Sequence, residues 1–118
     1  MNNKLIAVFC ILATALLPVQ VRASDSFIAT GMGTLSCGKV LEAINTGTGR
    51  TQVSIWMNGV VTGYNFYASA HVSPPDDETS IAFIKNYCSN NPLSNIVAGT
   101  AVMVQDLGGP KVSFKHKH

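Results

Sequence analysis

A chain of 118 residues, 47% of them hydrophobic, is long enough for one domain with its own core and too short for two. Its formal net charge of +2 includes Lys4 and Arg22, which lie in the first 23 residues, and without them six basic residues balance six acidic ones. A neutral domain lacks the basic face that nucleic-acid binding requires, so the composition argues against that class of partner.

Residues 1–23 have the pattern of a cleavable secretory signal peptide. Lys4 gives a positively charged start, an apolar run extends from Leu5 to Leu17, and Val21-Arg22-Ala23 offers small residues at the cleavage site. The apolar run is too short for a transmembrane helix, which needs about 20 residues. We therefore expect cleavage after Ala23, a periplasmic location and no membrane segment in the mature form.

The cysteines agree with export. Of the three cysteines, Cys10 leaves with the signal peptide, and Cys37 and Cys88 remain. Two cysteines in a small exported domain predict one disulfide, which would stabilise the fold by about 4 kcal/mol through loop closure. The alternative is a metal or redox pair, but no Cys-x-x-Cys occurs and no histidine lies at ligand spacing from either cysteine.

Hydrophobic periodicity predicts an all-α fold, a small four-helix domain over residues 24–110. Residues 24–35 are small, polar and rich in glycine, which indicates an extended arm. Ser36 is a candidate cap for a short helix with Cys37, Val40, Leu41 and Ile44 on one face. The Asn-Thr-Gly-Thr-Gly segment at 45–49 is expected to end that helix.

The strongest pattern predicts a long helix over about 51–70. Its apolar stripe follows helical spacing and comprises Val53, Trp56, Met57, Val60, Val61 and Tyr64. Gly59 and Gly63 each cost about 1 kcal/mol in a helix relative to alanine, which suggests close approach of a neighbouring helix.

Two further helices are predicted after the Ser73-Pro74-Pro75 stop. Carboxylates at 76–78 suit the N-terminus of the third helix, which would end at Asn90-Asn91-Pro92. Ser94 is the candidate cap of the fourth, which Gly108-Gly109-Pro110 would end. Residues 111–118 are expected to form a basic, flexible tail.

The sequence contains no convincing constellation of catalytic or metal-binding residues. His71 near Asp76 and Asp77 is the best cluster, and a helix cap explains these residues more simply. His116 and His118 in the tail could bind a metal only loosely. We therefore expect neither enzymatic activity nor a cofactor.

The aromatic residues suggest protein binding. Trp56 and Tyr64 share the core stripe of the long helix, whereas Phe66 and Tyr67 project elsewhere. Exposed aromatic side chains are common anchors of protein contacts. We take Trp56, Val60, Tyr64, Phe66 and Tyr67 as the candidate client- or partner-binding residues, and expect a homodimer with the long helix in its interface.

Several short motifs resemble the HdeA/HdeB-like periplasmic proteins. These are Ser36-Cys37 opening a short helix, Trp56 and Gly63-Tyr64 in a long helix, and Tyr87-Cys88 followed by Asn91-Pro92. The resemblance spans 35–104 and implies a helical fold with one disulfide and a dimer at neutral pH. Its best-known members are acid-stress chaperones that bind unfolded periplasmic clients through apolar surface. With six carboxylates this chain has a weaker acid trigger than those charge-rich proteins.

The chain also resembles the Tai-type immunity proteins of type VI secretion. These are small, exported, helical and disulfide-bonded, with a similar Trp and Gly-Tyr helix, and they inhibit a peptidoglycan amidase, a cell-wall-targeting toxin. The chain lacks the additional cysteines that this family carries near the C-terminus. On this resemblance, the inhibitory loops would be 45–51 or 70–78.

Overall fold

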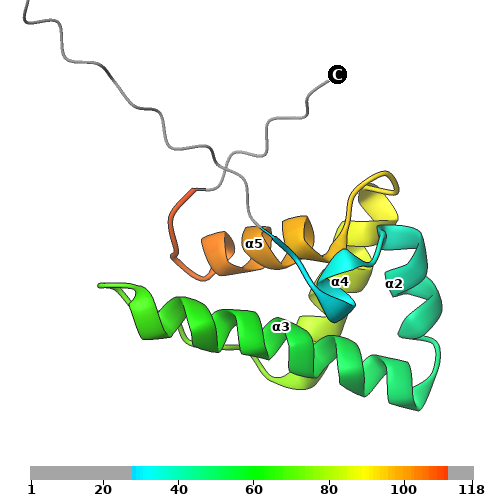
Figure 1. Ribbon diagram of the computed structural model, residues 1–118, viewed down its shortest axis with the longest axis horizontal. Helices are drawn as coiled ribbons and strands as arrows, with labels where there is room; N and C mark the ends of the chain where they lie inside the picture. The colour runs from blue at the N-terminus through cyan, green and yellow to red at the C-terminus, as the bar shows by residue number, and fades with distance from the viewer. Residues whose placement is uncertain (1–27, 112–118) are drawn as a thin grey trace, which may run out of the picture.

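A computed structural model describes residues 28–111, and the predicted signal peptide at 1–23 lies outside them. The described chain is all-α, as predicted, with four α-helices and one 3-10 turn (Figure 1). The elements are η2 (Gly31–Thr34), α2 (Cys37–Ala43), α3 (Gly47–Tyr67), α4 (Asp77–Asn90) and α5 (Ile96–Asp106). Of the predicted tail, only Lys111 is described.

Each helix begins at a side chain that accepts a hydrogen bond from a free backbone N–H of the first turn. Ser36 caps α2 and Asp76 caps α4, as predicted, the latter with 2.7 Å between Asp76 Oδ1 and Thr79 N. The prediction for α5 was wrong by one residue, because Asn95 is the cap and Ser94 Oγ instead lies 2.8 Å from the Tyr87 hydroxyl.

The long helix α3 begins earlier and ends earlier than the sequence pattern predicts. Thr46 accepts a hydrogen bond from Gly49 N at 3.1 Å, so Gly47 to Gly49 form the first turn of α3 rather than a loop. The helix ends at Tyr67, well before Pro74, because the following backbone is extended at Ala68. A Cβ atom at Gly49 would overlap the Ala43 carbonyl, so this position needs glycine.

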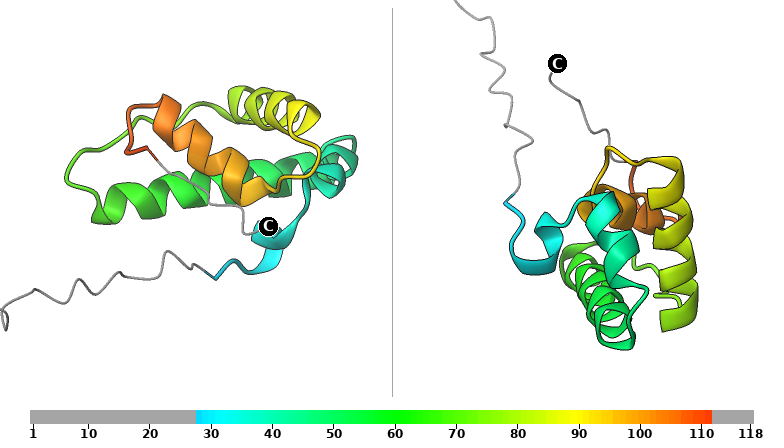
Figure 2. Two further views of the ribbon diagram at one scale, coloured as in Figure 1. Left: turned by 90° about the horizontal axis from the view of Figure 1, so that it is seen from above. Right: turned by 90° about the vertical axis from the view of Figure 1, so that its right-hand side faces the viewer.

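Helix α4 packs against α2, α3 and α5 and carries the centre of the core (Figure 2). Its Ile81, Ile84 and Cys88 are buried. The predicted disulfide is present: Cys37 and Cys88, both fully buried, join α2 to α4 with 4.8 Å between their Cα atoms. A single antiparallel bridge between Ser36 and Asn95 places the start of α5 beside the start of α2.

The predicted role of Gly59 and Gly63 is not borne out within the chain. A Cβ atom at either position would meet nothing within 4 Å in the described part of the protein. The close helix contact is instead at Gly99 of α5, where a Cβ atom would lie 2.7 Å from Tyr87 Cδ1 and would also overlap Ile84 Cδ1 of α4. Glycine at 99 therefore lets α5 approach α4.

The arm predicted for 24–35 is ordered over its described part. Residues 29–35, which we call the strap, include η2 and pack against both α3 and α5. In the right-hand view of Figure 2 the strap, in cyan, lies on the side of α2 and α3 that faces away from α4, in yellow. Within the strap, Gly33 is buried against the indole of Trp56.

Among residues 28–111, no helix combines the length and the hydrophobicity needed to cross a membrane.

We expect reduction of the disulfide to destabilise the domain by about 4 kcal/mol, since it closes a loop with a sequence separation of 51. Thiol titration of the denatured, unreduced mature protein is expected to find no free thiol. Thermal unfolding with and without reductant measures the loss, and two free thiols would contradict the bond.

The glycine contacts predict opposite effects of two alanine substitutions. Gly99→Ala is expected to lower the free energy of unfolding by about 1–3 kcal/mol, because its Cβ would push α5 away from α4. Gly59→Ala is expected to raise the free energy of unfolding of the monomer by up to about 1 kcal/mol, because the helix gains propensity and the Cβ meets open space within the chain. Urea unfolding of both variants distinguishes these outcomes, and equal effects would contradict the packing.

Candidate protein-binding surface

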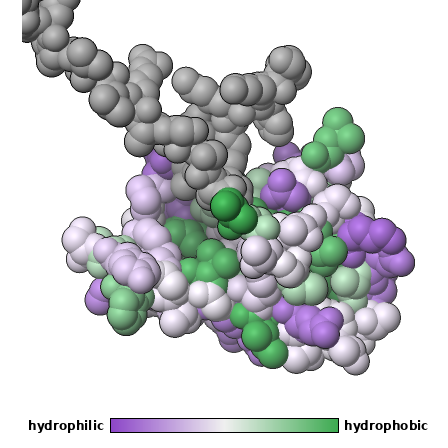
Figure 3. Space-filling view, in the orientation of Figure 1, coloured by the Kyte–Doolittle hydropathy of each residue, from purple (hydrophilic) through white to green (hydrophobic). Residues whose placement is uncertain are grey.

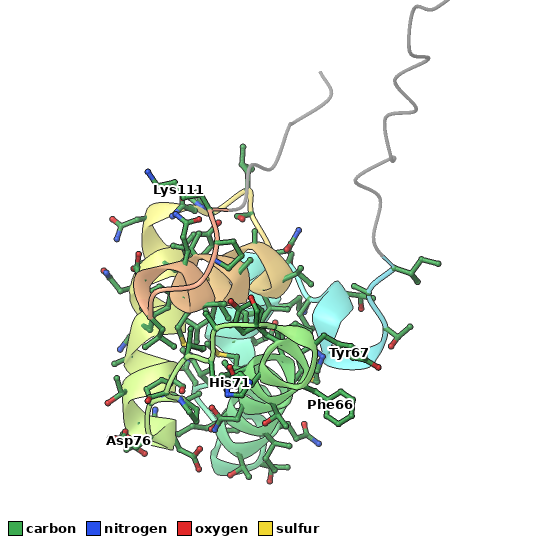
Figure 4. All side chains as sticks on the ribbon, turned by 90° about the vertical axis from the view of Figure 1, so that its left-hand side faces the viewer. Phe66, Tyr67, His71, Asp76 and Lys111 are labelled. Atoms are coloured by element: carbon green, nitrogen blue, oxygen red, sulfur yellow. A yellow bond between two sulfur atoms is a disulfide. The ribbon has the colours of Figure 1, made fainter. Side chains whose placement is uncertain are left out.

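Helix α3 exposes three large apolar side chains, of which Ile55 and Phe66 share its outer face. Ile55 is 64% exposed, Phe66 80% and Tyr67 87%, although helix residues of this kind are usually buried. The rings of Phe66 and Tyr67 meet edge to face with 5.0 Å between centroids. Figure 4, which looks along α3 from its C-terminal end, shows Phe66 pointing away from the other helices.

This outer face carries no charge. Gly59, Thr62 and Gly63 lie between Ile55 and Phe66 on the same side of the helix, and all are exposed. From Thr51 to Pro75 the sequence contains no Asp, Glu, Lys or Arg. A protein surface of this length without charge is suited to contact with another apolar surface.

The five predicted binding residues do not form one surface. Trp56, Val60 and Tyr64 follow one another at intervals of four residues, so they form a row along the side of α3 between its outer face and its buried face, and all three are half-buried. Trp56 and Tyr64 pack against the core, as predicted. Phe66 lies apart from this row, whereas Tyr67, seven residues after Val60, lies beside it and is exposed.

One end of the row borders a hollow of about 430 Å³ between the ends of α3 and α5. Its lining is uncharged and consists of Tyr64, Ala68, Ser69, Ala70, Gly108, Gly109 and Pro110. Gly108, with φ of 102°, ends α5. Its N–H donates a hydrogen bond to Gln105 O, and the N–H of Gly109 donates to Val104 O. The sequence identified these glycines as a helix stop, but the hollow depends on how α3 and α5 meet.

The loop between α3 and α4 is held by a side chain that the sequence analysis missed. The Asn65 amide donates to Val72 O at 2.8 Å and accepts from Val72 N at 2.9 Å. Val72 is buried, while His71 on its N-terminal side is exposed. The loop is therefore fixed at its centre and presents His71 to solvent.

Polar side chains join α3 to the start of α4 at the edge of the domain. Arg50 of α3 pairs with Glu78 of α4, and Asn58 Nδ2 donates to Asp77 Oδ1 at 2.8 Å. Both contacts are exposed, so each adds little to stability, and they orient the two helices.

The helix cap at Asp76 is sensitive to acid. Hydrogen bonds from the backbone and side chain of Thr79 lower the pKa of the Asp76 carboxyl below its ordinary value of 3.8. Figure 4 shows Asp76 at the start of α4, away from Phe66. The acidic group at 76–78 thus serves as a helix start, and within residues 28–111 no group of three His, Cys, Asp or Glu is placed to hold a metal ion.

The chain matches no protein-family model, no curated protein and no solved structure. The resemblances to HdeA/HdeB-like and Tai-type proteins therefore rest on short motifs alone.

We expect Asp76→Asn to flatten the acid end of the stability profile. A lowered folded-state pKa contributes stability above the unfolded pKa, and this contribution is lost as the pH falls through the folded value. Asparagine still caps the helix but does not titrate near this pH. The melting temperature, measured from pH 7 to pH 2, is expected to fall less in the variant than in the wild type.

The matched control is Asp106→Asn, which removes the same charge in the last turn of α5, where no N-cap is lost. A control that flattens the profile as much as Asp76→Asn would contradict a specific role for the cap.

Proposed function

We propose that the mature domain is a periplasmic protein-binding module, most simply an HdeA/HdeB-like chaperone that binds unfolded clients through apolar surface. The observation that carries this proposal is the uncharged exposed surface of α3, with Ile55 and Phe66 on its outer face and Tyr67 next to Phe66. Contact through such a surface needs no particular sequence in the client, because burial of apolar area is not directional.

Acid is the proposed trigger. Full protonation of the carboxylates leaves six Lys or Arg, three His and the new amino terminus, a charge of about +10 on the mature chain. Loss of the Asp76 cap and of the Arg50–Glu78 pair would loosen the junction of α3 and α4. The Cys37–Cys88 bond would keep α2 and α4 joined, which supports refolding on neutralisation.

At neutral pH the proposed partner of the outer face is a second copy of the chain. Two copies of an uncharged face meet without repulsion, and the exposed Gly59 and Gly63 leave room for close approach of a second helix. The homodimer would cover Phe66 and Tyr67 until self-repulsion at low pH separates the copies.

Light scattering of an acid-denatured client, with and without the mature protein, tests the proposal at pH 2–3 and at pH 7. We expect protection at the lower pH. Phe66→Ala combined with Tyr67→Ala is expected to weaken client binding about five- to thirtyfold, the effect of removing about 1–2 kcal/mol of anchor contact. Ser89→Ala, an exposed polar residue of α4 away from α3's outer face, is the control and is expected to change nothing.

Sedimentation of the same three proteins tests the dimer. The wild type and Ser89→Ala are expected to be dimers at neutral pH, and the double variant a monomer with unchanged helix content. A wild type that is monomeric at high micromolar concentration would contradict the dimer but not client binding.

The second candidate function is that of an immunity protein against a peptidoglycan amidase. The observation that favours it is the loop before α4, which Asn65 fixes at Val72 and which presents His71 and Pro74 to solvent. A fixed, exposed loop can enter a cleft with little loss of conformational freedom. The other predicted inhibitory segment, 45–51, is less suitable because most of it is the first turn of α3. Tight amidase binding at pH 7 without client protection at pH 2–3 would favour this function.

A further inference from the structure

The strap covers the end of the Trp56 row that lies away from the hollow. Gly33 is buried against the indole, so closely that a Cβ atom there would lie 2.8 Å from Trp56 Cζ2. Met32 and Leu35, which precede and follow Gly33 in the chain, are partly buried and pack against the core. The strap thus fits over Trp56 only because position 33 has no side chain.

The strap is attached weakly before Leu35. The hydrogen bonds of 30–34 are local: Gly33 N donates to Thr30 O, and Thr34 Oγ1 donates to Gly31 O. The first bond to another element is from Ile96 N to Leu35 O at 3.1 Å, and the bond from Cys37 N to Ser94 O follows. Segments held by a few apolar contacts open locally at a small fraction of the global unfolding free energy.

Removal of the strap would join two uncharged surfaces. The row of Trp56, Val60 and Tyr64 runs from the strap to the hollow beside Gly108–Pro110. Figure 3 shows hydrophobic surface in the space between α3 and α5, next to the strap. Eight residues of helix span about 12 Å, which matches about four residues of extended chain.

We propose that the strap is an autoinhibitory cover, and that its release opens a groove along Trp56, Val60 and Tyr64 for a short, extended, uncharged apolar segment of an unfolded protein. The inference rests on the proposed client binding and adds to the exposed outer face a second, covered site for the client. In the closed state the chain's own residues 29–34 occupy the site. The apparent affinity for a client is then the intrinsic affinity multiplied by the open fraction.

Trp56 is the single tryptophan of the chain, so its fluorescence reports on the strap directly. Gly33→Val places a side chain against the indole and is expected to release the strap at pH 7. The matched control is Gly38→Ala, an exposed position in α2 whose Cβ atom would meet only Ser36 Oγ, at 4.0 Å. Circular dichroism of each variant confirms that the helices are retained.

Two readouts are measured at pH 7: acrylamide quenching of Trp56, and affinity for a fluorescein-labelled, uncharged apolar hexapeptide. For Gly33→Val we expect stronger quenching and affinity higher by about ten- to a hundredfold, as for a site that is closed 90–99% of the time. Gly38→Ala is expected to match the wild type in both. Helical Gly33→Val protein in which Trp56 stays shielded, or in which Trp56 is exposed without a gain in affinity, would overturn the cover.

Hydrogen exchange of the wild type does not depend on any variant folding. When the hexapeptide binds, the amides of 29–34 are expected to exchange faster, and greater protection there would overturn the inference. The cover and the proposed function can fail separately. If the wild type protects clients at pH 2–3 while the strap stays in place, the chaperone function holds and the strap is not an autoinhibitory cover. If clients are protected from aggregation neither at pH 2–3 nor at pH 7, the proposed function is wrong and the cover is wrong with it.

Discussion

The Cys37–Cys88 bond fixes the start of α2 against the end of α4, and the rest of the domain is arranged around that pair. The bond is fully buried, and the neighbouring Cys37 N–H donates to Ser94 O. The bridge between Ser36 and Asn95 then sets where α5 begins. One short region of chain therefore positions α2, α4 and α5 together. A small domain needs such a constraint because its core alone supplies little stability.

Helix α3 is positioned differently, by side chains along its length. Val53, Met57 and Val61 bury its inner face, while Arg50 and Asn58 contact the start of α4. Only one side of α3 is needed for this packing, so Ile55 and Phe66 remain exposed on the other. The exposed face follows from the geometry of a long helix on a small core.

Stability is distributed unevenly over the domain. The disulfide, the caps and the close contact at Gly99 hold the helices, whereas the strap depends on apolar contacts at Met32 and Gly33. The part of the chain that covers Trp56 is therefore the part that costs least to release. The proposed cover depends on this difference, since the fold would have to persist while the strap moves.

The sequence by itself determined the four helices, the disulfide and the position of Phe66 and Tyr67 off the core stripe, because helical periodicity, cysteine pairing and capping residues are local or compositional signals. The sequence also contains a pattern that predicts the exposed face: Ile55 and Phe66 are eleven residues apart, which is three helical turns, so they share one side of the helix. Only the tertiary structure decided that Gly99 rather than Gly59 makes the close helix contact, that Asn65 holds Val72, and that Gly33 covers Trp56. Each of these joins residues from different elements, and the space around a glycine or the partner of an amide depends on which helix lies beside it.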